Sequence, residues 1–236
     1  MSKKDNSSDD KAGPSRTERV RQALRHAIID QKLTPGVRLP EDAIAESFGT
    51  SRTIAREALG RLAVEGLVDL QPNRGAFVAH PTPEEGQDIF VVRRALERAI
   101  VEDLVGNISA KDADYLRAMV AEESTRSDDD ADAIRLSGEF HLELARMTGN
   151  KLLVRYMTEV VSRCSLVLAI YGRAHSAYCG ACEHAEIVEA LIAGTRDKAL
   201  KLMDTHLSDV ANRAVLTVRN KGDIRDVLAA YAKKLK

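Results

Sequence analysis

Three histidines in the second half of the chain have the surroundings expected of metal ligands. His141, His184 and His206 each fall on the apolar stripe of a separate predicted helix, so all three should point toward a common interior. Buried imidazoles are costly unless they are paired or coordinated, and neutral imidazole is a good ligand for zinc, nickel, iron or copper. One inward histidine is more often an ordinary core residue, but three together favour a site for a divalent metal such as zinc or nickel.

An arginine and a glutamate lie one helical turn apart, upstream of the histidines. Arg93 and Glu97 have i, i+4 spacing on a stripe that also carries apolar residues. They could form a surface ion pair, which stabilises a helix by only about 0.2–0.5 kcal/mol. Alternatively, Arg93 could face a cavity and bind a carboxylate through two parallel hydrogen bonds. The sequence leaves both interpretations open.

Two cysteines, Cys179 and Cys182, form a CxxC pair close to His184. A single CxxC without a second pair is a weak indication of zinc, and a redox pair needs thiolate-stabilising surroundings that the sequence does not show. We therefore expect ordinary loop cysteines that precede a helix. The chain has three cysteines in all, which fits a reducing cytoplasm better than a disulfide scaffold.

A second group of polar residues lies in the first third of the chain. Ser51 is placed to cap a helix whose first turn and a half carries Arg52, Thr53 and Arg56. In a helix-turn-helix, these positions reach base edges and phosphates in the major groove of DNA. The spacing therefore predicts a DNA-binding surface here.

The elements that must position these side chains are two short helices, a turn and a β-ribbon. Apolar residues at helical spacing, including Phe48, give the first helix one inward face, and Gly49 ends it. Residues 67–70 and 76–79 alternate like two short strands. Arg74 lies in the turn between them, from which an arginine can reach the negative potential of a minor groove.

The rest of the chain has helical periodicity. Residues 1–15 are polar and predict a disordered tail, and residues 80–85 form a proline-containing linker at a predicted domain boundary. The sequence therefore predicts a mainly α protein, with a winged helix-turn-helix in residues 16–80 and an all-α bundle of six to seven helices in residues 81–236. The predicted helices outside the helix-turn-helix are 17–31, 89–105, 110–124, 131–148, 152–171, 181–193, 196–219 and 223–235.

Charge and hydropathy exclude several classes of protein. The formal net charge is −1, so the whole chain is not a basic nucleic-acid binder. Residues 16–80 carry ten Lys and Arg against eight Asp and Glu, whereas residues 81–236 carry 22 against 25. This weak imbalance has the sign expected of a DNA-binding domain followed by a sensor domain. No apolar run has transmembrane or signal-peptide character, so we expect a cytoplasmic protein without a membrane partner.

A pattern without gaps runs through residues 17–80. Its segments are Pro35-Gly36-x-Arg38-Leu39, Ile44-Ala45-Glu46, Ser51-Arg52-Thr53, Arg56-Glu57-Ala58-Leu59, Arg61-Leu62, Glu65-Gly66-Leu67-Val68 and Asn73-Arg74-Gly75. This pattern closely resembles the winged helix-turn-helix of GntR-type bacterial transcription regulators. The resemblance implies DNA contacts from Arg38, Ser51, Arg52, Thr53, Arg56 and Gly75 of the wing.

A second pattern covers the helices that follow. Its segments are Arg93-Arg94-Ala95-Leu96-Glu97, Phe140-His141, Gly149-Asn150, Glu183-His184-x-x-Ile187-Val188-x-Ala190-Leu191 and Met203-x-x-His206-Leu207. They resemble the C-terminal ligand-sensing (FCD) domain of the FadR-like branch of the same family. In many members three His, and an Asp four residues before the first, bind a divalent metal that helps to hold a small carboxylate effector. Ser137 replaces that Asp here, so the resemblance implies a three-His site completed by water or effector oxygens, with Ser137 and Arg93 at the effector.

These observations predict a transcription regulator that binds double-stranded operator DNA as a homodimer. A small organic or sugar acid would shift the orientation of the two DNA-binding domains. Two alternatives remain from the residues. One is a metal-dependent enzyme that uses the three histidines, which we do not expect because no second acid–base cluster shares their stripes. The other is a thiol redox switch at Cys179 and Cys182.

Overall fold

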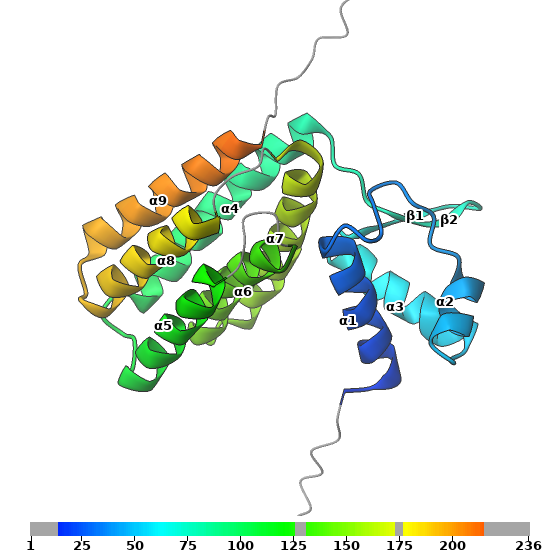
Figure 1. Ribbon diagram of the computed structural model, residues 1–236, viewed down its shortest axis with the longest axis horizontal. Helices are drawn as coiled ribbons and strands as arrows, with labels where there is room; N and C mark the ends of the chain where they lie inside the picture. The colour runs from blue at the N-terminus through cyan, green and yellow to red at the C-terminus, as the bar shows by residue number, and fades with distance from the viewer. Residues whose placement is uncertain (1–13, 126–130, 173–176, 215–236) are drawn as a thin grey trace, which may run out of the picture. The chain divides into compact units, whose positions relative to one another are not determined.

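The computed structural model describes residues 14–125, 131–172 and 177–214. Contacts within the chain divide it after His80 into two compact units, which Figure 1 shows as ribbons. Most of the predicted tail at 1–15, and the whole predicted helix at 223–235, lie outside the described residues.

The N-terminal unit is a small helical domain with a two-stranded wing, as predicted. Helix α1 (Arg16–Ile29) packs against α3 (Arg52–Val64), and the short α2 (Glu41–Ser47) also packs on α3. Strands β1 (Val68–Gln71) and β2 (Gly75–Val78) follow (Figure 1). The buried core draws on all of these elements and includes Val20, Leu24, Ile28, Ile44, Ala55, Leu59, Leu62, Val68 and Val78.

Helix α3 begins where the sequence predicts because Ser51 caps it. The Ser51 hydroxyl accepts a hydrogen bond of 3.3 Å from the backbone N–H of Ile54. Gly49, with φ of 56°, adopts the left-handed conformation that lets the chain turn between α2 and α3. The predicted inward face of α2 is wrong at Phe48, which is 42% exposed because the helix has already ended at Ser47.

The wing is an antiparallel pair of strands joined by a tight turn. Val68 pairs with Val78 and Gln71 with Gly75, so each strand is displaced by one residue from its predicted range. Asn73 and Gly75 both have positive φ, of 59° and 98°, where the chain reverses. The turn is exposed at the end of the ribbon, which leaves its side chains accessible.

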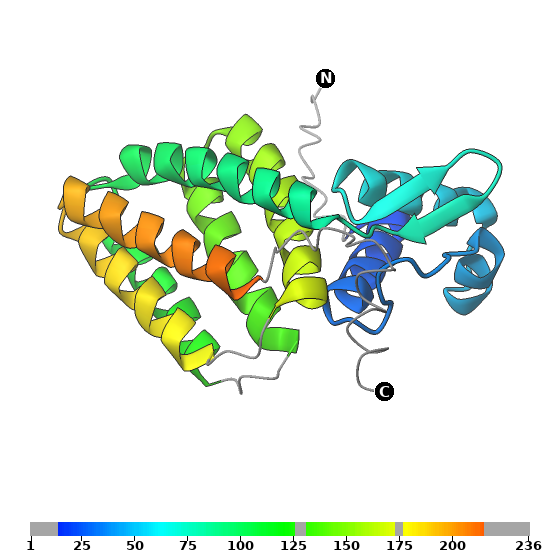
Figure 2. The ribbon, with the colours of Figure 1, turned by 90° about the horizontal axis from the view of Figure 1, so that it is seen from above.

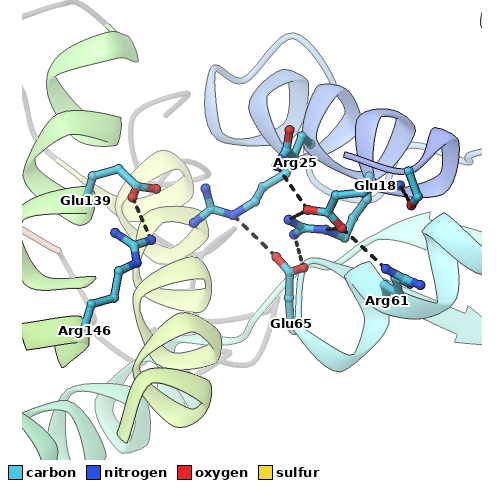
Figure 3. A network of polar contacts seen from close by, with 9 residues as sticks. Glu18, Arg25, Arg61, Glu65, Glu139 and Arg146 are labelled. Atoms are coloured by element: carbon cyan, nitrogen blue, oxygen red, sulfur yellow. Dashed lines mark hydrogen bonds and ion pairs between the residues drawn. The ribbon is translucent and has the colours of Figure 1, made fainter. Parts of the chain in front are cut away.

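A network of charged side chains joins α1 to α3 and the residue that follows it (Figure 3). Arg21 donates hydrogen bonds to Glu18 on its own helix and to Glu65 after α3. Arg25 lies 3.4 Å from Glu65, and Arg61 lies 3.5 Å from Glu18. Each partly exposed pair contributes little by itself. Together they constrain how α3, which carries the candidate DNA-binding residues, lies against α1.

The C-terminal unit is an all-α bundle, as predicted (Figures 1 and 2). Helix α4 packs against α7 and α9, α5 packs against α8, and α6 packs against α7. None of the described helices is long and apolar enough to cross a membrane. The described helices of this unit are α4 (Pro83–Leu104), α5 (Ala110–Ser124), α6 (Ala131–Met147), α7 (Lys151–Tyr171), α8 (Ala177–Ile192) and α9 (Arg196–Arg213).

Helix α4 begins earlier than predicted. The Thr82 hydroxyl accepts a hydrogen bond of 3.2 Å from the N–H of Glu85, and the Glu85 carboxylate accepts one of 2.7 Å from the N–H of Thr82. This reciprocal pair is a capping box. Pro83 occupies the first helical position, where a missing N–H costs nothing. The predicted linker at 80–85 is therefore wrong in its second half, because its second proline opens the helix.

Helix α8 also begins earlier than predicted, at Ala177. Cys179 and Cys182 therefore lie in its first turns and not in a loop, which corrects that prediction. Cys182 is a free and exposed thiol, whereas the side chain of Cys179 lies outside the described residues. The thiol redox switch stays an alternative that these positions do not test.

The inward face of α4 is more polar than the sequence predicts. Helical spacing from Leu96 and Ile100 places Val92 on the inward stripe, but Val92 is 49% exposed. Arg93 and Glu97 face the interior instead, at 4% and 0% exposed. The buried face is thus rotated by one residue, and it brings a charged pair into the centre of the bundle.

Candidate metal centre and DNA-binding surface

Three histidines from three helices meet inside the bundle. His141 on α6, His184 on α8 and His206 on α9 are all at most 2% exposed. Nε2 of His206 lies 3.2 Å from Nε2 of His141 and 3.3 Å from Nε2 of His184. Phe140 stacks on the His184 ring, with 4.2 Å between the ring centroids. The sequence predicted that these imidazoles point to a common interior, and their placement agrees with that prediction.

Two of the rings have a carboxylate at their other nitrogen. Nδ1 of His184 lies 2.7 Å from Oε2 of Glu123, and Nδ1 of His206 lies 2.6 Å from Oε2 of Glu183. Glu123 is 3% exposed, and a buried carboxylate requires such a partner. An ionised carboxylate only accepts hydrogen bonds, so this arrangement favours a ring proton at Nδ1 of both histidines. Their Nε2 atoms then present lone pairs to the centre of the cluster.

The third ring has a less regular arrangement. Nδ1 of His141 lies 2.8 Å from Oε1 of Glu97, but the angle does not suit a hydrogen bond, and Oε2 of Glu97 has no partner in the described residues. Nε of Arg93 donates to Oε1 of Glu97 at 3.3 Å, and Nη1 of Arg93 lies 3.5 Å from Sγ of Cys164. Burial raises the pKa of Glu97 to about 7, against the opposing effect of Arg93. Glu97 thus links the buried guanidinium to the histidine cluster.

The geometry of the three rings suits a divalent metal ion. Burial lowers the pKa of His141 and His206 well below the ordinary value, which favours the neutral, ligating form. Two imidazole nitrogens bound to a tetrahedral zinc ion lie about 3.3–3.4 Å apart. The observed separations of 3.2 and 3.3 Å are close to that value. A carboxylate behind each ring is also the usual support of ligating histidines, because it fixes the tautomer and the ring orientation.

The positions expected to meet the effector lie near this cluster in the fold. Ser137 is half-buried on α6, one helical turn before His141, and Arg93 lies in the buried pair described above. A groove of about 270 Å³ lies elsewhere, between α5 and α8, and its lining includes Val120 and Val188. The groove includes neither Arg93 nor the histidines. An effector cavity beside them stays a prediction.

The carboxylates of Glu123 and Glu183 are functional candidates that the sequence analysis missed. Glu123 follows Leu116 and Val120 on the buried stripe of α5. A charged residue on an apolar stripe is unusual, so the sequence could have indicated Glu123 as a candidate. Glu183 precedes one histidine in the sequence but contacts another, His206 on α9. No spacing rule predicts a contact of that kind.

The expected DNA-contacting residues of α3 are exposed at its N-terminal end. Arg52, Thr53 and Arg56 all face outward, and the arginine side chains are 71% and 73% exposed. Ser51 is exposed as well, but its hydroxyl caps the helix. Because the opposite face of α3 is apolar and buried, these side chains form the outward surface of the helix.

Both of these arginines are paired with acidic residues in the first turn of α2. Arg56 donates to both carboxylate oxygens of Glu41, from Nε at 2.8 Å and from Nη2 at 2.7 Å. Arg52 forms an ion pair with Asp42. The hydrogen bonds from Arg56 hold the pKa of Glu41 below its usual value. The sequence analysis did not predict these pairs.

The remaining expected DNA contacts come together at the wing. Arg38 forms a β-bridge with Phe77, and a Cβ atom built at Gly75 would lie 3.8 Å from Nε of Arg38. The positive φ of Gly75 favours glycine at that position. The guanidinium of Arg74 lies 5.7 Å from the centre of the Phe77 ring, within the range of a cation–π contact. The structure thus brings Arg38, Arg74 and Gly75 together at the wing.

Comparisons with known families match both units. Residues 16–78 match the family described as "Bacterial regulatory proteins, gntR family", and residues 88–209 match the FCD domain. The chain belongs to the GntR family of transcription regulators. The matches confirm the predicted resemblance for both halves of this GntR regulator. They also exclude the alternative of a metal-dependent enzyme, because the family consists of regulators.

Individual relatives agree with this assignment. The GntR regulator is 30% identical over 190 residues to an uncharacterized HTH-type transcriptional regulator in an unstable DNA locus of Streptomyces ambofaciens, covering 79% of this chain and 80% of the relative. It is 30% identical over 212 residues to the Uxu operon regulator of Haemophilus influenzae, covering 81% and 79%. A crystal structure of a GntR-type regulator from Rhodococcus sp. RHA1 aligns with a TM-score of 0.73 and 30% identity, covering 87% of this chain and 100% of that one.

Proposed function

We propose that this regulator binds operator DNA as a homodimer, and that a small carboxylate effector held beside a divalent metal ion controls its affinity for DNA. One observation carries the proposal. Nε2 of His206 lies 3.2 Å from Nε2 of His141 and 3.3 Å from Nε2 of His184, and the ligand atoms of all three rings lie within 4.8 Å of one another. Each ring also has a carboxylate beside its Nδ1. Zinc and nickel are among the ions that imidazole ligands suit.

The carboxylate class of the effector follows from charge. Three imidazole ligands leave a coordination position for an oxygen ligand on a tetrahedral ion. Ser137 supplies no carboxylate at the position where relatives with an Asp ligand have one, so an effector oxygen can take that place. A metal ion and the buried Arg93 guanidinium both attract an anion, and burial strengthens that attraction relative to water. An organic or sugar acid satisfies both groups.

Control of DNA binding follows from the two-unit organisation. A homodimer presents two winged helices to a pseudo-palindromic operator, and the spacing of the half-sites must match the spacing of the α3 helices. An effector that favours one orientation of the DNA-binding units changes operator affinity. Because such coupling is reciprocal, operator DNA should change effector affinity by the same factor.

Restoring a carboxylate at Ser137 should tighten metal binding. Ser137→Asp adds an anionic ligand one helical turn from His141, on the same helix face. We expect the dissociation constant for Zn²⁺ to fall by about tenfold or more, because even groups outside the coordination shell change metal affinity 10–100-fold. Competition titration with a chromophoric chelator measures the change. The neutral control, Ser137→Asn, should bind Zn²⁺ as the wild type does, and equal affinity in both variants would place residue 137 away from the ion.

Calorimetry on Arg93 variants tests the effector proposal. A thermal-shift panel of lactate, succinate, citrate, gluconate and glucuronate on Zn²⁺-loaded protein would first select a ligand. Arg93→Ala should then weaken its binding by about tenfold or more, because a charge-assisted hydrogen bond contributes ~1.5–3 kcal/mol. Arg93→Lys should recover part of the loss, since it keeps the charge. Arg98→Ala is the matched control, because Arg98 is 63% exposed and pairs with Glu102.

Two results would count against this part of the proposal. If Arg93→Ala binds the selected acid as tightly as the wild type, Arg93 is only the structural partner of Glu97. If the selected acid binds metal-free protein as tightly as Zn²⁺-loaded protein, the metal takes no part in effector binding.

A further inference from the structure

The acidic residues at the start of α2 occupy donors of Arg52 and Arg56 that could otherwise bind DNA. Glu41 accepts two parallel hydrogen bonds from Arg56, at 2.8 and 2.7 Å, which is the bidentate geometry of arginine with a carboxylate. Arginine uses the same pair of N–H groups to bind a phosphate or the O6 and N7 atoms of guanine. DNA that binds Arg56 through this edge, Nε and Nη2, must therefore displace Glu41. Arg52 forms a second ion pair with an acidic residue of α2, from its Nε to Oδ1 of Asp42.

Among the arginines expected to contact DNA, those paired with acids in the described residues lie on α3. Arg38 and Arg74, at the wing, have no carboxylate within ion-pair distance among the residues that the structure describes. The wing arginines are thus available to any duplex, whereas the arginines of α3 are already bound. The pairs on α3 also join two separate helices, unlike the common i, i+4 pairs within one helix.

We infer that Glu41 and Asp42 compete with DNA for Arg56 and Arg52, and that this competition raises the sequence specificity of the regulator. The inference rests on the proposed DNA contacts of α3. On DNA of unrelated sequence, a phosphate offers Arg56 little more than Glu41 already provides, so the pair persists. At a matching base pair the bidentate contact with the base edge displaces Glu41. The acids therefore reduce non-specific affinity more than specific affinity.

The experiment compares Glu41→Gln with Glu46→Gln. Glu46 is exposed on the same helix, and its replacement removes the same charge. Two probes are used, a random-sequence duplex and a duplex enriched by the wild-type protein from a randomised library. Glu41→Gln should raise affinity for the random-sequence duplex about fivefold or more and for the enriched duplex by less, so that the specificity ratio falls. The salt dependence on the random-sequence duplex should steepen by about one, because Arg56 gains a phosphate contact.

The control should behave differently. Glu46→Gln should change both affinities by a similar small factor and leave the salt slope as it is in the wild type. Asp42→Asn provides an independent second variant, since it frees Arg52 in the same way. Thermal unfolding of each variant checks that the domain is intact.

A double-mutant cycle decides whether Arg56 is responsible. In an Arg56→Ala background, Glu41→Gln should give no more gain on the random-sequence duplex than Glu46→Gln does. A full gain in that background would overturn the inference, because the effect would then be general charge removal. Equal behaviour of Glu41→Gln and Glu46→Gln in the wild-type background would overturn it as well. If Arg56 does not contact DNA at all, the result is different: Arg56→Ala then binds the enriched duplex as tightly as the wild type.

Discussion

Arg52→Ala and Arg56→Ala should each weaken binding to the enriched duplex by about five- to 150-fold, the range expected for a bidentate contact with a base. Both side chains project from the exposed N-terminal end of α3, which is the part of a recognition helix that enters the major groove. Arg74→Ala at the wing should cost less and should reduce the salt slope by about one, as for a phosphate contact. Fluorescence anisotropy titrations at several salt concentrations measure both quantities.

The control for this series is Arg98→Ala, which removes the same charge from an exposed position of α4. It should leave the affinity for the enriched duplex unchanged. Wild-type affinity of the Arg52→Ala, Arg56→Ala double variant would refute the assignment of α3 as the recognition helix. In that case the exposed arginines would serve only to hold α2 against α3.

The second large effect concerns the histidine cluster. His184→Ala should reduce Zn²⁺ affinity by more than the 10–100-fold that is typical for loss of a group supporting a ligand, because it removes a ligand itself. Glu123→Gln, which keeps the size of the side chain behind His184, should reduce affinity within that range of about 10–100-fold. His80→Ala removes an exposed imidazole and is the matched control. Zn²⁺ binding by His184→Ala at wild-type affinity would exclude His184 as a ligand.

Thermal unfolding with and without Zn²⁺ provides a second readout. A ligand that binds only the folded state stabilises it by about 2.7 kcal/mol at a hundredfold excess over its dissociation constant. The wild type and His80→Ala should therefore show a clear rise in Tm on addition of Zn²⁺. His184→Ala should show little, even if loss of the ring leaves Glu123 unpaired and lowers the starting Tm.

The elements around the DNA-binding residues were predictable because local rules determine them. Ser51 caps α3 through its own hydroxyl, and Gly49 has the positive φ that glycine favours. The start of α4 was equally local and could have been predicted. Thr82 and Glu85 have the spacing of a capping box, with Pro83 between them, but the prolines were interpreted as a linker.

The candidate metal centre was predictable only in part. Apolar stripes place His141, His184 and His206 toward the interior, and periodicity alone is enough for that inference. The partners of the rings come from other helices, as Glu123 on α5 illustrates, and such contacts depend on how the helices pack. Glu97 was recognised only as a partner of Arg93.

The ion pairs between α2 and α3 could not be predicted from the sequence either. Arg56 and Glu41 are 15 residues apart, and their contact depends on the angle at which the two helices cross. Charge counting gives the correct sign for the DNA-binding domain, with ten basic against eight acidic residues, but it does not show which arginines are neutralised. The contact between Glu41 and Arg56 could be identified only from the three-dimensional structure.

Metal titration of wild-type protein, followed by X-ray absorption spectroscopy of the loaded form, tests the metal centre most directly. We expect one Zn²⁺ or Ni²⁺ per chain, with a first shell that contains three imidazole nitrogens, at about 2.0–2.1 Å in the zinc form. The His184→Ala protein should lose that signature. If the purified wild type carries no divalent metal and binds none on titration, or if the bound ion shows no imidazole ligands, then His141, His184 and His206 form a packed histidine cluster and the metal-dependent control of DNA binding is wrong.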